Sequence, residues 1–140
     1  MKSLNYIFFY TYIGLVILAG FWGAFIYPVW DFQILFQLDL QKLPEYTQVN
    51  LLSQYRFLRA LELGFGLFAI LFLKEIFSRK KFNQLFLGIM GLGVLARMVS
   101  WSVDGIPSSL FIFFLAYEAL GLSIIFAYSR KLGIYHASRD

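Results

Sequence analysis

Long apolar runs alternate with short polar breaks along most of the chain. Four of these runs have the roughly 20 mostly apolar residues that a helix needs to cross about 30 Å of hydrocarbon. They cover residues 7–27, 51–73, 82–103 and 110–128. Pro28, the segment Lys74–Lys81 and the sequence Gly105-Ile106-Pro107 separate them. The pattern predicts an all-α integral membrane protein, with residues 1–140 forming a single four-helix bundle of four transmembrane spans.

The composition supports lipid as the surrounding medium. Hydrophobic residues make up 60% of the 140 residues and charged residues 14%, whereas soluble domains carry roughly 45–50% and about 25%. The net charge is +4, but the basic residues lie at the ends of apolar runs rather than on one polar face. Because nucleic-acid binding needs a contiguous basic surface, we expect none here.

The residues that usually hold metals and cofactors are scarce. The chain has no cysteine, which excludes disulfides, thiolate metal sites and cysteine nucleophiles. Its single histidine, His136, lies in a polar tail, where a solvated side chain is expected more than a metal or haem ligand. We therefore expect no metal and no cofactor.

Lysine and arginine predict the orientation, because positively charged loops remain in the cytoplasm. In a four-span arrangement only Lys42 lies on one side. The other side carries Lys2, Lys74, Arg79, Lys80, Lys81, Arg130, Lys131 and Arg139. Both termini should therefore be cytoplasmic. A cleaved signal peptide is the rival interpretation of the first run, but the run is long for a signal and no small-residue cleavage site follows it cleanly.

Residues 28–50 form the one long connection. Apolar residues alternate there almost as in a strand, yet one helical face also accounts for Phe32, Leu35, Phe36, Leu40 and Leu43. An unpaired strand edge cannot lie in hydrocarbon, so we favour an amphipathic segment at the outer interface, anchored by Trp30 and Tyr46. It is either a plain loop or a functional lid.

Six ionisable residues lie inside the predicted spans: Arg56, Arg59, Glu62, Arg97, Asp104 and Glu118. An Arg or Asp at a helix centre costs about 2.5–3.5 kcal/mol on insertion scales, so such residues should face the bundle interior and pair. Within each span they are spaced so that they share one helical face. The residues of the second span lie on one face of that helix, and those of the third lie on one face of theirs. We expect two layers near the outer face, Arg59 and Arg97 with Glu62 and Glu118 below, and Arg56 with Asp104 above.

Three positive and three negative groups give this cluster a formal charge of 3 − 3 = 0. Because its charges cancel, the cluster favours either a structural ion-pair brace or a site for a neutral or zwitterionic ligand. Its carboxylates could also move protons if their pKa values are pushed apart. Tyr55, Trp101 and Tyr117 are near enough in sequence to line a small pocket, although aromatic residues in spans more often pack or anchor.

Three motifs resemble a family of uncharacterised bacterial four-span membrane proteins, domain of unknown function 4345. The motifs are Arg56-Phe57-Leu58-Arg59 leading to Leu63-Gly64-Phe65-Gly66, Ala96-Arg97-Met98-Val99-Ser100 leading to Asp104-Gly105-Ile106-Pro107, and Glu118 in the last span. The resemblance covers about the last two thirds of the chain, and Glu62 is not part of it. It implies a four-span fold in the bacterial cytoplasmic (inner) membrane and implies no activity.

These observations leave three hypotheses. The first is binding or transport of a small polar or zwitterionic molecule, or a lipid headgroup, at the charge cluster. The second is an accessory subunit of a larger membrane complex or a homo-oligomer, with the cluster as brace and small residues such as Ala119, Ser123 and Ala127 as docking positions. The third, an enzyme using Glu62 and Glu118 as acid and base, lacks a nucleophile motif and a metal cluster, so we expect no catalysis.

Overall fold

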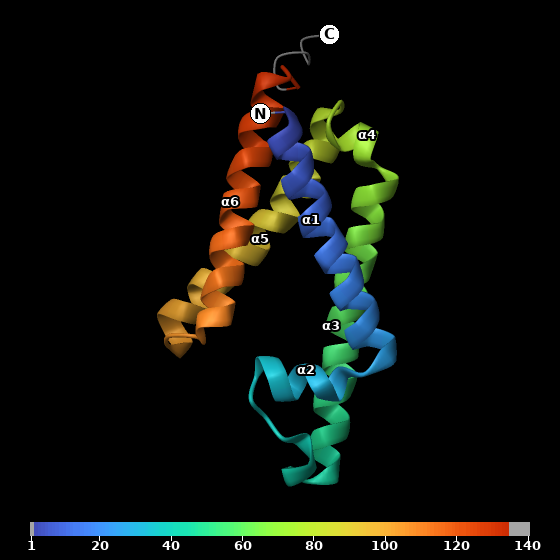
Figure 1. The fold of residues 1–140 in the computed structure, drawn as a ribbon, viewed down its shortest axis with the longest axis vertical. Coiled ribbons are helices and arrows are strands. Elements are labelled where there is room, and N and C mark those ends of the chain that lie inside the picture. Colours follow the sequence, from blue (N-terminus) through green and yellow to red (C-terminus); the bar gives the residue numbers. More distant parts are fainter. Residues whose placement is uncertain (1, 135–140) are drawn as a thin grey trace. The chain divides into compact units, whose positions relative to one another are not determined.

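The computed structural model describes residues 2–134 and is helical in every regular element (Figure 1). The elements are α1 (Lys2–Phe21), the π-helix η1 (Trp22–Ile26), α2 (Pro28–Leu35), the 3-10 helix η2 (Leu40–Lys42), α3 (Glu45–Leu71), α4 (Leu73–Ile76), α5 (Lys80–Asp104) and α6 (Ser109–Lys131). His136 and Arg139, for which solvation and a cytoplasmic location were predicted, lie outside the described residues.

Three helical stretches are long and apolar enough to cross a membrane: Ser3–Ile26, Lys80–Asp104 and Ser109–Lys131. They extend the first, third and fourth predicted spans by a few residues, and the break at Pro28 is confirmed. The second predicted span, residues 51–73, largely coincides with α3, which begins six residues earlier, at Glu45, and ends two residues earlier, at Leu71. It is not among the apolar stretches, since it carries Arg56, Arg59 and Glu62.

The chain divides into two compact units, and α1 contributes to both. The central unit consists of residues 13–70, and the terminal unit consists of residues 2–12 and 71–134 among those described. In the terminal unit α5 packs against α6. Its core joins Phe9 to Phe77 and Phe86, with ring centroids 5.6 and 5.5 Å apart. The buried Asn83 amide donates to the Ser129 hydroxyl and to the Ile76 carbonyl.

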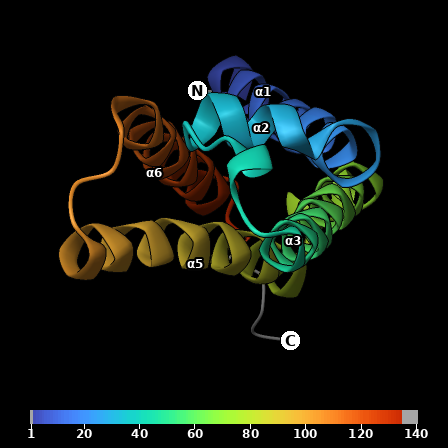
Figure 2. The same ribbon diagram turned by 90° about the horizontal axis from the view of Figure 1, so that it is seen from below.

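The long connection is helical, so the strand alternative is wrong for residues 28–50. Pro28 opens α2, where its missing N–H and fixed φ are tolerated, and the chain then returns through η2 to α3 (Figure 2). Phe32 and Leu40, two residues of the expected apolar face, form a core with Tyr55. Phe36, another member of that face, is exposed but contacts the Phe32 ring at 5.4 Å.

Glycines bring α1 and α3 together in the central unit. A Cβ atom at Gly20 would lie 2.7 Å from the Leu63 backbone nitrogen and 2.9 Å from the Arg59 carbonyl oxygen. A Cβ at Gly66 would lie 2.5 Å from Cγ1 of Ile17. Close backbone approach of this kind is how helices associate in lipid, where the hydrophobic effect does not drive them together.

We expect Gly20→Ala to destabilise the protein by about 1–3 kcal/mol, because the new methyl group meets backbone atoms that cannot rotate away. Gly14→Ala is the matched control in the same helix, since open space surrounds the position that its methyl group would occupy. Thermal unfolding in detergent measures both. Equal melting temperatures for the two variants would contradict close packing at Gly20.

Candidate functional site

Arg59 is the centre of a polar network in the central unit. It lies on one face of α3 with Tyr55 four residues before it and Glu62 three residues after it. Its Nε donates to the Tyr55 hydroxyl at 2.8 Å, and one terminal nitrogen donates to Glu62 Oε2 at 2.6 Å. The other terminal nitrogen also donates to the Tyr55 hydroxyl. All three nitrogens of the guanidinium are therefore hydrogen-bonded.

Asp31 extends this network from α3 to α2. The Tyr55 hydroxyl donates to Asp31 Oδ2 at 2.8 Å, and Arg59 Nε lies 3.9 Å from the same oxygen. The Asp31 and Arg59 side chains are only 14% and 16% exposed. Tyr55 was predicted to line a pocket. It instead lies in the core, 9% exposed, and bridges an arginine and a carboxylate.

Asp31 was not predicted as a site residue, because residues 28–50 were assigned to the membrane interface, where a carboxylate needs no partner. Its position at the first turn of a helix that opens with Pro28 was the one available signal. An acidic residue is favoured there in any helix, however, and so the position did not point to a network.

Arg56 satisfies a backbone group at the end of η1. Its guanidinium donates to the Ala24 carbonyl oxygen. In a continuing helix that oxygen would accept from the residue four positions on, but this residue is Pro28, which has no N–H. One turn along α3, a Cβ at Gly23 would lie 2.6 Å from Arg59 Cγ. The end of the first apolar helix thus lies directly on the two arginines of α3.

The terminal unit holds a second ion pair, between α5 and α6. Arg97 Nε donates to Glu118 Oε2 at 2.9 Å, and its terminal nitrogen donates to Oε1 at 3.2 Å. This two-point geometry is the strong form of an arginine–carboxylate contact. The Arg97 side chain is 36% exposed and that of Glu118 18%, so the pair lies partly at the surface of the unit.

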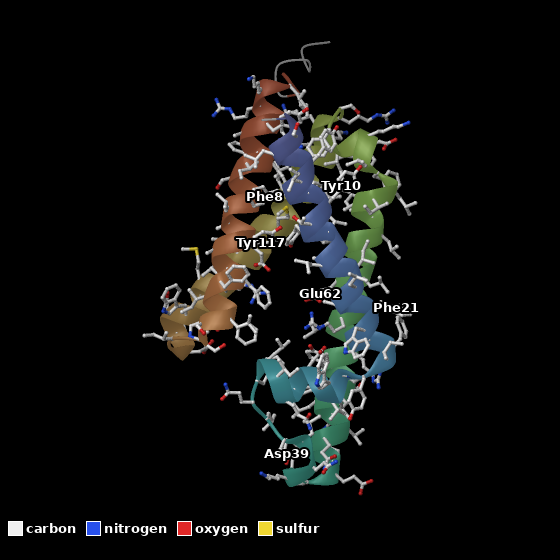
Figure 3. All side chains as sticks on the ribbon, in the orientation of Figure 1. Phe8, Tyr10, Phe21, Asp39, Glu62 and Tyr117 are labelled. Carbon is white, nitrogen blue, oxygen red and sulfur yellow. The ribbon has the colours of Figure 1, made fainter. Side chains whose placement is uncertain are left out.

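The remaining predicted residues of the terminal unit have separate environments. Asp104 is the last residue of α5, is exposed, and pairs with no side chain among residues 2–134. Trp101 lines a groove between α5 and α6. Tyr117 shares a hydrogen bond with Thr11, and its ring centroid lies 5.6 Å from that of Phe8. Phe8 and Tyr117 are labelled in Figure 3.

The structure thus brings the six predicted residues together only in part. Arg59 contacts Glu62, and Arg97 contacts Glu118. Arg56, Arg59 and Glu62 belong to the central unit, whereas Arg97, Asp104 and Glu118 belong to the terminal unit. A single cluster uniting the two groups, in two layers, stays a prediction. Within the described part of the chain, no group of three or more histidines, aspartates and glutamates could hold a metal ion.

Tyr55→Phe should destabilise the protein by about 1–3 kcal/mol, the usual effect of leaving buried polar groups without a partner. Asp31 loses a donor and Arg59 an acceptor, so α2 should also become more sensitive to limited proteolysis. Tyr46→Phe is the control, because Tyr46 lies in the same helix and is 79% exposed. Thermal unfolding and protease digestion in detergent test both effects. Identical behaviour of the two variants would argue against a bridging role for Tyr55.

A family model, described as domain of unknown function (DUF4345), matches residues 5–128. No curated protein and no solved structure matches the chain. The match spans both units and contains Asp31 and all six ionisable residues predicted within the spans, and it supports the family resemblance drawn from the sequence motifs. The chain therefore belongs to the DUF4345 family.

Proposed function

We propose that the protein crosses the membrane four times, with α3 as the additional span. At 27 residues α3 would extend about 40 Å, which is sufficient for the hydrocarbon core. Its charged residues argue against insertion only if they lack partners. Each charged residue of α3 has such a partner. Arg56 donates to the Ala24 carbonyl, and Arg59 and Glu62 are paired with each other. Arg59 also donates to Tyr55, which in turn donates to Asp31.

With four spans, the basic segment around α4 and the basic end of α6 lie on one side of the membrane. The segment around α4 contains Lys74, Arg79, Lys80 and Lys81, and the end of α6 contains Arg130 and Lys131. Lysine and arginine in short loops remain in the cytoplasm. Both chain ends are then cytoplasmic, in a bacterial inner membrane, and α2 and η2 lie at the outer face.

Cysteine labelling tests this topology directly, because the chain has no cysteine of its own. In intact spheroplasts, Gln41→Cys and Ile106→Cys should react with a membrane-impermeant maleimide, whereas Ser78→Cys should react only after the membrane is permeabilised. Labelling of Ser78→Cys from outside would contradict the four-span arrangement.

The function we propose is binding or transport of a small polar or zwitterionic molecule, or of a lipid headgroup, at these intramembrane charges. The observation that carries it is the exposure of the two ion pairs. Glu62 is 46% exposed and Arg97 is 36% exposed, although both lie on helices predicted to be within the bilayer. Because a charge facing lipid is costly, each of these groups needs a polar neighbour beyond its present partner.

The charges of each unit indicate which kind of ligand it would bind. In the central unit Arg56 and Arg59 are balanced by Asp31 and Glu62, so the formal sum is 2 − 2 = 0. In the terminal unit Arg97 is balanced by Glu118 and Asp104 adds a negative charge, so the formal sum is 1 − 2 = −1. Neither set has surplus positive charge, so a zwitterion or an uncharged dipolar molecule is favoured over an anion.

The alternative is an accessory subunit of a larger membrane complex, in which the ion pairs act as an internal brace. The two-point contact between Arg97 and Glu118 favours it, since this contact joins two helices and uses both carboxylate oxygens without a ligand. In that case the small-residue faces would bind a partner protein or a second copy of the chain.

Native mass spectrometry of the purified protein separates the two functions. For binding, we expect a non-covalent ligand on the wild type that is lost from at least one of Glu62→Gln and Glu118→Gln while that variant remains folded. Glu45→Gln, in the exposed first turn of α3, is the control and should retain the ligand. A ligand-free wild type, together with lower thermal stability of Glu118→Gln and a copurifying protein, would instead favour the brace.

A further inference from the structure

An apolar groove runs between α5 and α6 in the terminal unit. It encloses about 560 Å³, is open to the surface, and is lined by Val94, Met98, Trp101, Ser102, Ile112, Leu115, Ala116 and Ala119. None of these residues belongs to the ion pairs. The groove is therefore a feature separate from the two ion pairs.

The shape of the groove follows from side-chain size and helical spacing. Its lining residues recur every three or four positions on each helix, so they form one continuous stripe along the two helices. From Val94 to Ser102 this stripe is about 12 Å long. Ala116 and Ala119 are the smallest of these side chains and leave space on the α6 side. The result is an open apolar groove between the two helices.

Beyond the Ser102 end of the groove, the end of α5 is polar and negatively charged. The Ser102 hydroxyl, at that end, donates to the Met98 carbonyl oxygen at 2.9 Å. Asp104 follows two residues later, exposed and without a partner among the described residues. The carbonyl end of α5 adds partial negative charge at the same place. Trp101 is 39% exposed beside it, as amphipathic side chains are at a membrane interface.

We propose that the groove binds one acyl chain of a phospholipid whose headgroup carries an ammonium ion, with the ammonium beside Asp104. Both helices are apolar enough to cross a membrane, so hydrocarbon is the medium that reaches the groove. The apolar length of the groove matches a segment of an acyl chain. The negative charge at the end of α5 favours a cationic group in the lipid headgroup over an anionic one. An amphipathic lipid therefore fits both the groove and the charged end of α5.

Quenching of Trp101 fluorescence tests the proposal. The chain has three tryptophans, so Trp22→Phe with Trp30→Phe leaves Trp101 as the single reporter. Phosphatidylethanolamine brominated on its acyl chains is titrated into the full-length protein in detergent. We expect saturable quenching, and tighter binding than for phosphatidylglycerol brominated in the same way. Quenching that rises linearly with lipid and never saturates would overturn the proposal.

Variants in this background locate the site. Ala116→Phe fills the groove and should abolish saturable quenching, whereas Ala96→Phe, on the opposite face of α5, should preserve it. Ala119→Leu replaces Ala116→Phe if that variant does not fold. Asp104→Asn should reduce the preference for phosphatidylethanolamine by about two- to fivefold, the usual size of an exposed ion pair. Saturable quenching that survives groove filling, or a preference unchanged by Asp104→Asn, would contradict the assignment.

Discussion

The hydrogen-bonded guanidinium of Arg59 is the constraint on which the central unit depends. A long apolar helix that carries an arginine, a carboxylate and a second arginine can enter hydrocarbon only when those groups are satisfied by protein. Tyr55 meets this requirement because its hydroxyl accepts from Arg59 and donates to Asp31 at the same time. The position of α2 against α3 thus follows from the need to satisfy one buried charge.

The same requirement explains how the first apolar helix ends. Pro28 deprives the Ala24 carbonyl of its helical donor, and Arg56 supplies a charged donor in its place. Gly20 and Gly23 allow this end of the helix to approach α3 closely enough for the contact. The helix break, the glycines and the arginines therefore belong to one local arrangement, in which the freed carbonyl and the arginine are partners.

The helices could be predicted from the sequence because each is encoded by an apolar run of about 20 residues, in which no single residue decides the outcome. The apolar runs, Pro28 and the Gly105 turn account for the ends of the three apolar helical stretches to within a few residues, the first of which combines α1 with η1. The partners of the charges were harder to predict. Arg97 and Glu118 form an ion pair, but the contact of Asp31 with Tyr55 depends on α2 folding back onto α3, and no periodicity within either helix encodes that return.

The two ion pairs differ in a way that bears on what each can do. Arg97 and Glu118 join different helices, so their contact can fix how α5 packs against α6. Arg59 and Glu62 are three residues apart in one helix, and a pair of that kind constrains no second element. Arg59 gains its structural role through Tyr55 and Asp31, whereas Glu62 contacts no second helix. Of the two carboxylates in the Arg59 network, the half-exposed Glu62 is therefore more available to a ligand than Asp31.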